Sequence, residues 1–264
     1  MILRRITQHV KAQNWFAVGL DFLIVIVGIL IAFQITNWGE ERAAHAKLSR
    51  VEEVLQVNLR FIYFNAKQRL SLAECRAQVF QSIAQNLLAP GDGWEGMPRS
   101  DSNNDFKQVL TPLLRSPHRP WEAQTWEAEL AQGTFNIMDD ERRELLNGIF
   151  RQVDLAKALQ NDIFALQGRL KVLAVSTDIP RDSRLRYYDI LGELDDKSGL
   201  LELIAEQIIK GIETVGVNTP VDRRQLIIEG LSSAITRARE TYGACYVSPR
   251  FAAYDWLPDN EAAQ

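Results

Sequence analysis

Few residues in this sequence have the types and spacing that catalysis requires. Asp139, Asp140 and Glu141 could form an acidic catalytic or metal-binding cluster. They directly precede a helical apolar pattern, however, and acidic side chains are favoured at a helix N-terminus, where they cap backbone N–H groups. The histidines are scattered along the chain: His9, His45 and His118. We therefore predict no catalytic residues and no metal site, and we expect a protein that is not an enzyme.

A second pattern could bind a dinucleotide. Gly91, Gly93 and Gly96 follow the spacing Gly-x-Gly-x-x-Gly. That motif needs a strand before it and a helix that opens at the third glycine, so that helix N–H groups meet the pyrophosphate. Here a helix is expected to end before the glycines, and Pro98 follows them. The pattern therefore predicts a loop, and we expect no cofactor.

The residue that most needs explanation is an aspartate inside an apolar run, "FAVGLDFLIVIVGILIAFQITNW", residues 16–38. Asp21 and Gln34 are its strongly polar members before the exit, and about 20 apolar residues suffice to cross a hydrocarbon layer of ~30 Å. Trp15 and Trp38 bracket the run, as interfacial tryptophans do. A cleaved signal peptide would show small residues in an Ala-x-Ala arrangement at the exit, which this run lacks. The pattern predicts a transmembrane helix over residues 16–38.

Helical geometry places Asp21 on a narrow face with small residues. The other members of this Asp21 face are Gly28, Ala32, Gly39, Ala43 and Ala46. Gly28-x-x-x-Ala32 is a spacing that lets two helices approach closely in lipid. Three interpretations remain open: a hydrated carboxylate near the interface, a helix-packing site in a homo-oligomer or with another membrane protein, and a proton relay. For the third, the run resembles the spans of stator proteins. Gln34 lies on the opposite face, near the far interface.

Basic residues flank the predicted span on both sides. Residues 1–15 are expected to form a basic amphipathic juxtamembrane arm, with Arg4, Arg5 and Lys11 at the lipid headgroups. Arg42, Lys47 and Arg50 match them on the other side, so the count of basic residues is a tie. The arm has no acidic residue. We therefore expect the N-terminus in the cytoplasm and the C-terminal domain outside it.

The rest of the chain, residues 39–264, is predicted to be an α-helical bundle domain with a loop at about 90–105. A long helix is expected to continue out of the membrane to Ala89, with a possible break near Ser71. No run indicates a confident strand, so the predicted fold class is all-α. The further expected helices are a short one over 106–114, one that ends by Gly133, one from Asp139 or Asp140 to about Val175, a short piece after Pro180, one from Gly199 to about Val215, and one from Pro220 or Asp222 to Tyr242.

Charge and cysteine content exclude several classes of partner. The net charge is −4, and because three basic residues precede the span, the remaining domain is more acidic still. Nucleic acid is therefore not expected as a partner. Cys75 and Cys245 are too few for a disulfide framework and lack zinc-ligand spacing. A long-range bridge would need an oxidising compartment, and we expect two buried free thiols instead.

The N-terminal 40 residues resemble a family of uncharacterised single-span bacterial membrane proteins with a domain of unknown function. The residues that carry this resemblance are Arg4-Arg5, His9-Val10, Trp15, Asp21-Phe22, Gly28, Gln34-x-x-Asn37-Trp38 and, more loosely, Trp126 and Gly133. Family members commonly have an asparagine where this chain has Gly39. The resemblance implies a helical protein anchored in the bacterial inner membrane by a single pass, and it implies no activity.

Three hypotheses on function follow. The leading one is a membrane-anchored structural or interaction protein whose partners are the lipid bilayer and a second copy or another membrane protein, contacted through Asp21, Gly28 and Ala32. The second is a sensory or ligand-binding module of the bacterial envelope. The third is a stator-like subunit that couples proton flow through Asp21.

Overall fold

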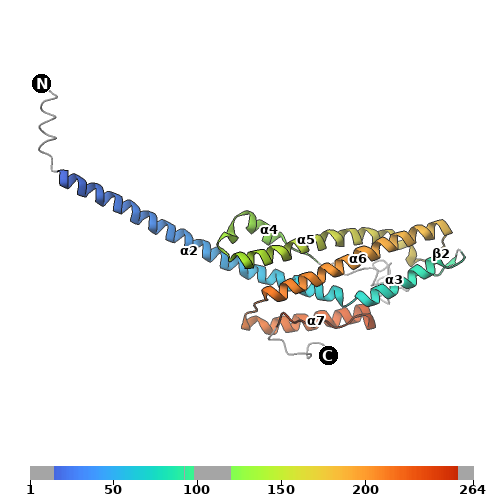
Figure 1. The fold of residues 1–264 in the computed structure, drawn as a ribbon. Helices are drawn as coiled ribbons and strands as arrows, with labels where there is room; N and C mark the ends of the chain where they lie inside the picture. The colour runs from blue at the N-terminus through green and yellow to red at the C-terminus, as the bar shows by residue number, and fades with distance from the viewer. Residues whose placement is uncertain (1–14, 92, 98–119, 255–264) are drawn as a thin grey trace, which may run out of the picture. The chain divides into compact units, whose positions relative to one another are not determined.

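The computed structural model describes residues 15–91, 93–97 and 120–254, and this part of the chain is almost entirely helical (Figure 1). It contains six α-helices and two very short strands, which confirms the predicted all-α class. The chain divides into two units, residues 1–50 and residues 51–264, and helix α2, Trp15–Leu70, belongs to both. The predicted N-terminal arm up to residue 14, the predicted helix 106–114, Trp256 and part of the 90–105 loop lie outside the described residues.

The second unit is built around the antiparallel pair α5, Asp140–Arg169, and α6, Arg181–Val215, with α3, Ala73–Leu88, packed against α6 (Figure 1). Apolar residues at helical spacing explain why these segments are helices that pack together. On α5 the buried residues include Leu146, Ile149, Phe150, Val153, Ala156, Leu159, Ile163 and Leu166. This agrees with the helical apolar pattern that follows the acidic run, although Leu145 is exposed.

Helix α6 corrects one prediction. A short piece followed by a separate helix from Gly199 was expected, whereas a single helix runs from Arg181 to Val215. Gly192 and Gly199 lie on its exposed side. A glycine in a helix costs only about 1 kcal/mol relative to alanine, which burial of Leu194, Leu201 and other residues on the inner side readily outweighs.

Of the two alternatives, one uninterrupted helix to Ala89 or two helices with a break near Ser71, the structure has the second, since α2 ends at Leu70 and α3 begins at Ala73. The Lys67 carbonyl in the last turn of α2 accepts from both the Ser71 backbone N–H at 3.1 Å and the Ser71 hydroxyl at 2.9 Å. The two strands, β1, Gly93–Trp94, and β2, Thr177–Asp178, pair antiparallel. They were not predicted, because two residues are too few to show a period.

Two shorter segments complete the core. Helix α4, Gln124–Ala131, ends before Gly133 as expected and is followed by the 3₁₀ turn η1, Thr134–Ile137. The Trp126 ring stacks on Phe135 and Phe150 at centroid distances of 4.4 and 5.2 Å. A second 3₁₀ turn, η2, Lys171–Ala174, ends the helical region that was predicted to extend to Val175.

The C-terminal part begins with η3, Val221–Arg223, and continues into α7, Arg224–Tyr242, and η4, Gly243–Cys245. The helix start predicted near Pro220 is confirmed. The segment after η4 returns to α2, where Phe251 and Tyr254 are buried against Tyr63.

The cysteines correct another prediction. Cys75 near the start of α3 and Cys245 in η4 form a disulfide, with their Cα atoms 5.3 Å apart. Both residues are partly exposed rather than buried. The expectation of two buried free thiols was wrong. The cysteines are 170 positions apart in the sequence, and nothing between them signalled that α7 returns the chain to the start of α3.

Candidate functional site

The N-terminal part of α2 exposes a long apolar surface. An 18-residue window has a mean hydropathy of 2.6, and none of it is buried. Its large side chains are exposed by 40 to 67 per cent, for example Phe22, Leu30 and Phe33. A core helix of a soluble protein would bury such side chains, and water-exposed apolar surface of this extent marks an interaction site. The helix is therefore long and apolar enough to cross a membrane.

In the described part of the chain, no other segment packs on the residues of the Asp21 face. Asp21, Gly28 and Ala32 are exposed. A Cβ atom added at Gly28 would meet no atom within 4 Å. Among residues 15–91, 93–97 and 120–254, none forms a hydrogen bond or ion pair with the Asp21 carboxylate. The face is thus open to another helix along its whole length.

The remaining predicted membrane residues lie near the ends of the apolar run. Trp38 is 63 per cent exposed, and the Arg42 guanidinium lies over its ring at 5.6 Å from the centroid. Gln34 is exposed. Trp15 is the first residue of α2. The predicted headgroup residues Arg4, Arg5 and Lys11 lie outside the described part of the chain.

The acidic run and the glycine pattern have structural roles. Asp139 is the N-cap of α5, and its carboxylate accepts a hydrogen bond from the Arg142 backbone N–H at 3.0 Å. Gly96 has φ +84°, and a Cβ there would lie 3.1 Å from the Ser176 nitrogen. No helix opens at Gly96. This glycine therefore permits a close backbone approach rather than forming a phosphate loop.

Buried arginines join α2 and α3 to α6. Arg76 Nε donates to Glu202 Oε1 at 2.8 Å, and its Nη1 donates to Asp195. Burial alone would lower the pKa of Arg76, but these hydrogen bonds outweigh it and the pKa is raised. Arg69 lies 3.7 Å from Glu202, and burial lowers the pKa of Arg69 to about 10. Arg69 and Arg76 stand seven residues apart among apolar residues at helical spacing, and this was the sequence signal for a buried ion network, which the sequence analysis missed.

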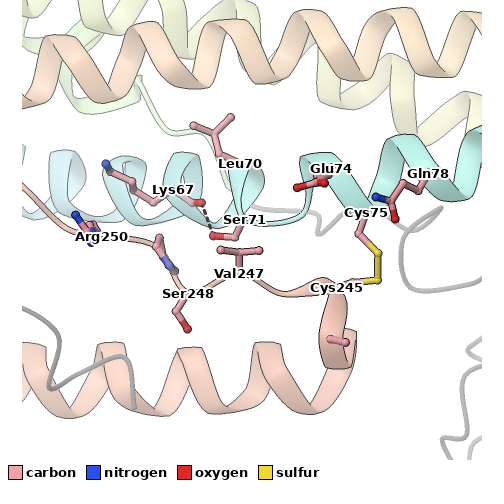
Figure 2. A pocket seen from close by; sticks show the side chains of 12 residues that line it. Lys67, Leu70, Ser71, Glu74, Cys75, Gln78, Cys245, Val247, Ser248 and Arg250 are labelled. Carbon is pink, nitrogen blue, oxygen red and sulfur yellow. Dashed lines mark hydrogen bonds between the residues drawn. A yellow bond between two sulfur atoms is a disulfide. The ribbon is translucent and has the colours of Figure 1, made fainter.

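The disulfide borders a cavity of about 540 Å³ (Figure 2). Figure 2 shows Val247 opposite Ser71 and the disulfide that links α3 to η4. The Val247 N–H donates to the Ser71 carbonyl at 3.1 Å, so the segment after η4 is held against the α2–α3 break. The covalent bond and this hydrogen bond together fix the C-terminal part of the chain to the bundle.

Comparison of the chain with protein-family models, with curated proteins and with solved structures finds no match. The resemblance to single-span bacterial proteins therefore stays a prediction, and the function has to be argued from the residues and their geometry.

Proposed function

We propose that this protein is a single-pass membrane protein of structural or interaction function, anchored by residues 16–38 of α2. The observation that carries the proposal is the apolar window of α2 with no buried residue. Transfer of apolar surface from water to lipid contributes about 25 cal/mol per Å². The same helix continues to Leu70 and contributes buried residues such as Leu59 and Ile62 to the core.

The disulfide supports an orientation. Disulfides persist in oxidising compartments and are rare in the cytosol, where thiols are kept reduced. Cys75 and Cys245 both belong to the C-terminal domain. We infer that this domain lies on the extracytoplasmic side of a bacterial inner membrane and that the N-terminus lies in the cytoplasm. A reporter fused after Gln264 that is active only outside the cytoplasm would test this orientation.

The Asp21 face is the proposed contact for association in the membrane. In lipid no hydrophobic effect drives helices together, and small residues allow the close packing that does. Gly28 and Ala32 provide this surface one helical turn apart. A carboxylate costs about 2.5 to 3.5 kcal/mol at the centre of a span and less towards its ends, where Asp21 lies. A hydrogen-bonding partner for Asp21 on a second helix would offset this cost and favours association. A second copy of this chain offers that partner at the same depth.

Cysteine crosslinking in native membranes tests this contact. Gly28→Cys places a thiol on the Asp21 face, and Leu30→Cys places one at nearly the same depth on the opposite face. Under a mild oxidant, the first variant is expected to yield a disulfide-linked dimer and the second to stay monomeric. Equal crosslinking of both variants would contradict the contact. The unsubstituted chain is the control, because it shows whether the native cysteines, which form the intramolecular disulfide, yield any dimer themselves.

Asp21→Asn in the Gly28→Cys chain separates packing from proton transfer. An amide keeps the hydrogen-bonding capacity of the side chain and loses its titration. If Asp21 acts in packing, the crosslinked dimer persists in this variant. Loss of the dimer would indicate that the ionisable carboxyl itself is required.

A further inference from the structure

The cavity beside the disulfide lies between the α2–α3 break and the chain that follows α7 (Figure 2). Its volume is about 540 Å³, and both members of the disulfide, Cys75 and Cys245, line it. Small-molecule sites commonly have volumes of about 300 to 1,000 Å³. The protein therefore leaves room beside the S–S bond for a reactant of that size.

Both cysteines are partly exposed to solvent. Two residues that line the cavity next to them, Gln78 on α3 and Ala244 in η4, are exposed. A thiolate reduces a disulfide by direct attack on a sulfur atom, so access decides whether the bond reacts in the folded protein. Exposed disulfides are the labile and regulatory ones, whereas buried cysteines are inert. By this criterion the Cys75–Cys245 bond is open to exchange.

The segment directly after η4 lies along the end of α2, and residues 246–254 are here called the C-terminal strap. Phe251 and Tyr254 in this strap are 8 and 3 per cent exposed. Their rings pack against Tyr63 at centroid distances of 6.2 and 5.8 Å. The Ala253 N–H donates to the Tyr63 hydroxyl at 3.0 Å. The C-terminal strap therefore covers aromatic surface of α2.

The disulfide fixes one end of the C-terminal strap. Cys245 immediately precedes the strap, and the Val247 N–H within it donates to the Ser71 carbonyl at 3.1 Å. A crosslink at this point restricts how far the strap can move from α2, which raises the free energy of its local opening. Once the bond is reduced, the strap is held by hydrogen bonds and ring contacts and opens more often.

From these observations we propose that the Cys75–Cys245 disulfide is a thiol-exchange site that a dithiol reductant opens in the folded protein. Its reduction releases the C-terminal strap from α2 and uncovers the Tyr63 ring. The substrate class is a molecule with two neighbouring thiols, such as the cysteine pair of a dithiol oxidoreductase. The site lies wholly within residues 51–264, so the proposal goes beyond the proposed membrane anchor and does not depend on it.

The exchange conserves atoms and electrons. A thiolate of the reductant attacks Cys245 Sγ, a bond forms between these two sulfur atoms, and the bond to Cys75 Sγ breaks. Cys75 leaves as a thiolate in the first turn of α3, where backbone N–H groups favour negative charge. The second thiolate of the reductant then attacks the reductant's own sulfur in the mixed disulfide and expels Cys245. The reductant loses two electrons and forms an internal disulfide, and its two protons pass through water to the cysteine thiolates.

Reduction kinetics of the detergent-solubilised full chain with dithiothreitol test whether the folded protein exchanges. Free thiols are quantified over time by alkylation and mass spectrometry. We expect a rate that is proportional to the dithiothreitol concentration and nearly the same without urea and at urea concentrations below the unfolding transition. A rate that rises steeply with urea in this range would show that the bond reacts only after unfolding, and would overturn the proposal.

Gln78→Trp tests the cavity as the route of the thiolate. Gln78 lines the cavity one turn after Cys75 and is exposed, so an indole there fills space beside the bond. Gln81→Trp is the matched control, because Gln81 is exposed on the same helix one turn further on and does not line the cavity. We expect reduction of Gln78→Trp to be slower by about threefold or more, and that of Gln81→Trp to be unchanged. Equal rates in the two variants would contradict the assignment.

Hydrogen exchange followed by mass spectrometry tests release of the C-terminal strap. The backbone N–H groups of Val247 and Ala253 are hydrogen-bonded in the closed strap. In Cys75→Ser/Cys245→Ser, peptides from the strap should exchange about tenfold faster or more than in the oxidised chain, at a rate nearly independent of low urea, as local opening is. The reduced unsubstituted chain should behave in the same way.

Two results of this experiment would overturn the release. Strap exchange that is the same in the oxidised chain and in Cys75→Ser/Cys245→Ser would show that the bond does not hold the strap against α2. Strap exchange that rises with urea in step with that of α5 would show that the whole domain opens instead, since global unfolding depends on urea and local opening does not.

Discussion

Cys75 and Cys245 are joined by a disulfide although 170 residues separate them in the sequence. The bond links the start of α3 to the turn after α7, and thereby closes a loop that contains α5, α6 and α7. Adjacent to it, the Val247 N–H donates to the Ser71 carbonyl. The C-terminal part of the domain is therefore linked to the bundle at the point where α2 gives way to α3.

Reduction of this disulfide should destabilise the domain. A bond that closes a loop of this length stabilises by about 2 to 5 kcal/mol, mainly by constraining the unfolded chain. Urea unfolding of the purified protein with and without a phosphine reductant measures the difference. Cys75→Ser/Cys245→Ser should match the reduced protein. If the oxidised, reduced and substituted forms unfold at the same urea concentration, the bond does not form in solution.

Loss of the Arg76 side chain should strongly lower the stability of the domain. Arg76→Met leaves Glu202, whose side chain is 13 per cent exposed, without its bidentate partner. Removal of one member of a buried ion pair costs about 3 to 5 kcal/mol. Chemical denaturation should show that Arg76→Met/Glu202→Gln recovers part of this loss. A double variant as unstable as the sum of both single variants would contradict the coupling.

Two buried tyrosines predict a loss of stability at alkaline pH. Burial, and then the hydrogen bond to Glu213, raise the pKa of Tyr63 above its usual value of 10. Burial raises the pKa of Tyr254 to about 12. Because the folded pKa exceeds the unfolded one, each tyrosine contributes stability that is present below about pH 10 and is lost as the pH rises through the folded value.

Tyr63→Phe is therefore expected to cost about 1.5 to 3 kcal/mol at neutral pH, where a hydrogen bond to a carboxylate is lost. The cost should shrink between pH 10 and 12. Arg69, whose pKa burial lowers to about 10, acts in the opposite sense in this range, so the difference between variant and unsubstituted chain is the quantity to measure. A cost independent of pH would show that Tyr63 ionises normally.

Alanine substitutions at two glycines of α6 should change the stability of the fold in opposite directions. A Cβ at Gly211 would lie 2.8 Å from Cγ1 of the buried Ile149, whereas one at Gly192 meets no atom within 4 Å. Gly211→Ala is expected to cost about 1 to 3 kcal/mol through overpacking. Gly192→Ala should stabilise by about 0.5 to 1 kcal/mol through helix propensity. If both variants unfold at a higher denaturant concentration than the unsubstituted chain, or both at a lower one, the α5–α6 packing is contradicted.

Local signals predicted much of the helical architecture. Asp139 capped α5 as expected, and apolar spacing identified most of its buried face. The apolar part of α2, long enough to cross a membrane, was recognisable because its length and hydropathy alone define it. These features depend on neighbours in sequence, and for that reason they could be read without knowledge of the fold.

Features that depend on distant residues were missed. Gly199 suggested a helix start, but packing against α5 and α3 keeps α6 continuous. The pairing of Cys75 with Cys245 depends on the return of α7 to α3. One cavity of the domain is lined by Arg142 of α5 together with Thr219 and Arg224, and no spacing in the sequence relates α5 to that loop.

Alkaline carbonate extraction of membranes from cells that produce the full chain tests the anchor most directly. High pH strips proteins held by charge or by surface contact, whereas a helix that spans the hydrocarbon layer stays in the bilayer because its apolar surface favours lipid. The full chain should remain in the membrane pellet and enter solution only with detergent. Recovery of the full chain in the carbonate supernatant would contradict the membrane span of α2.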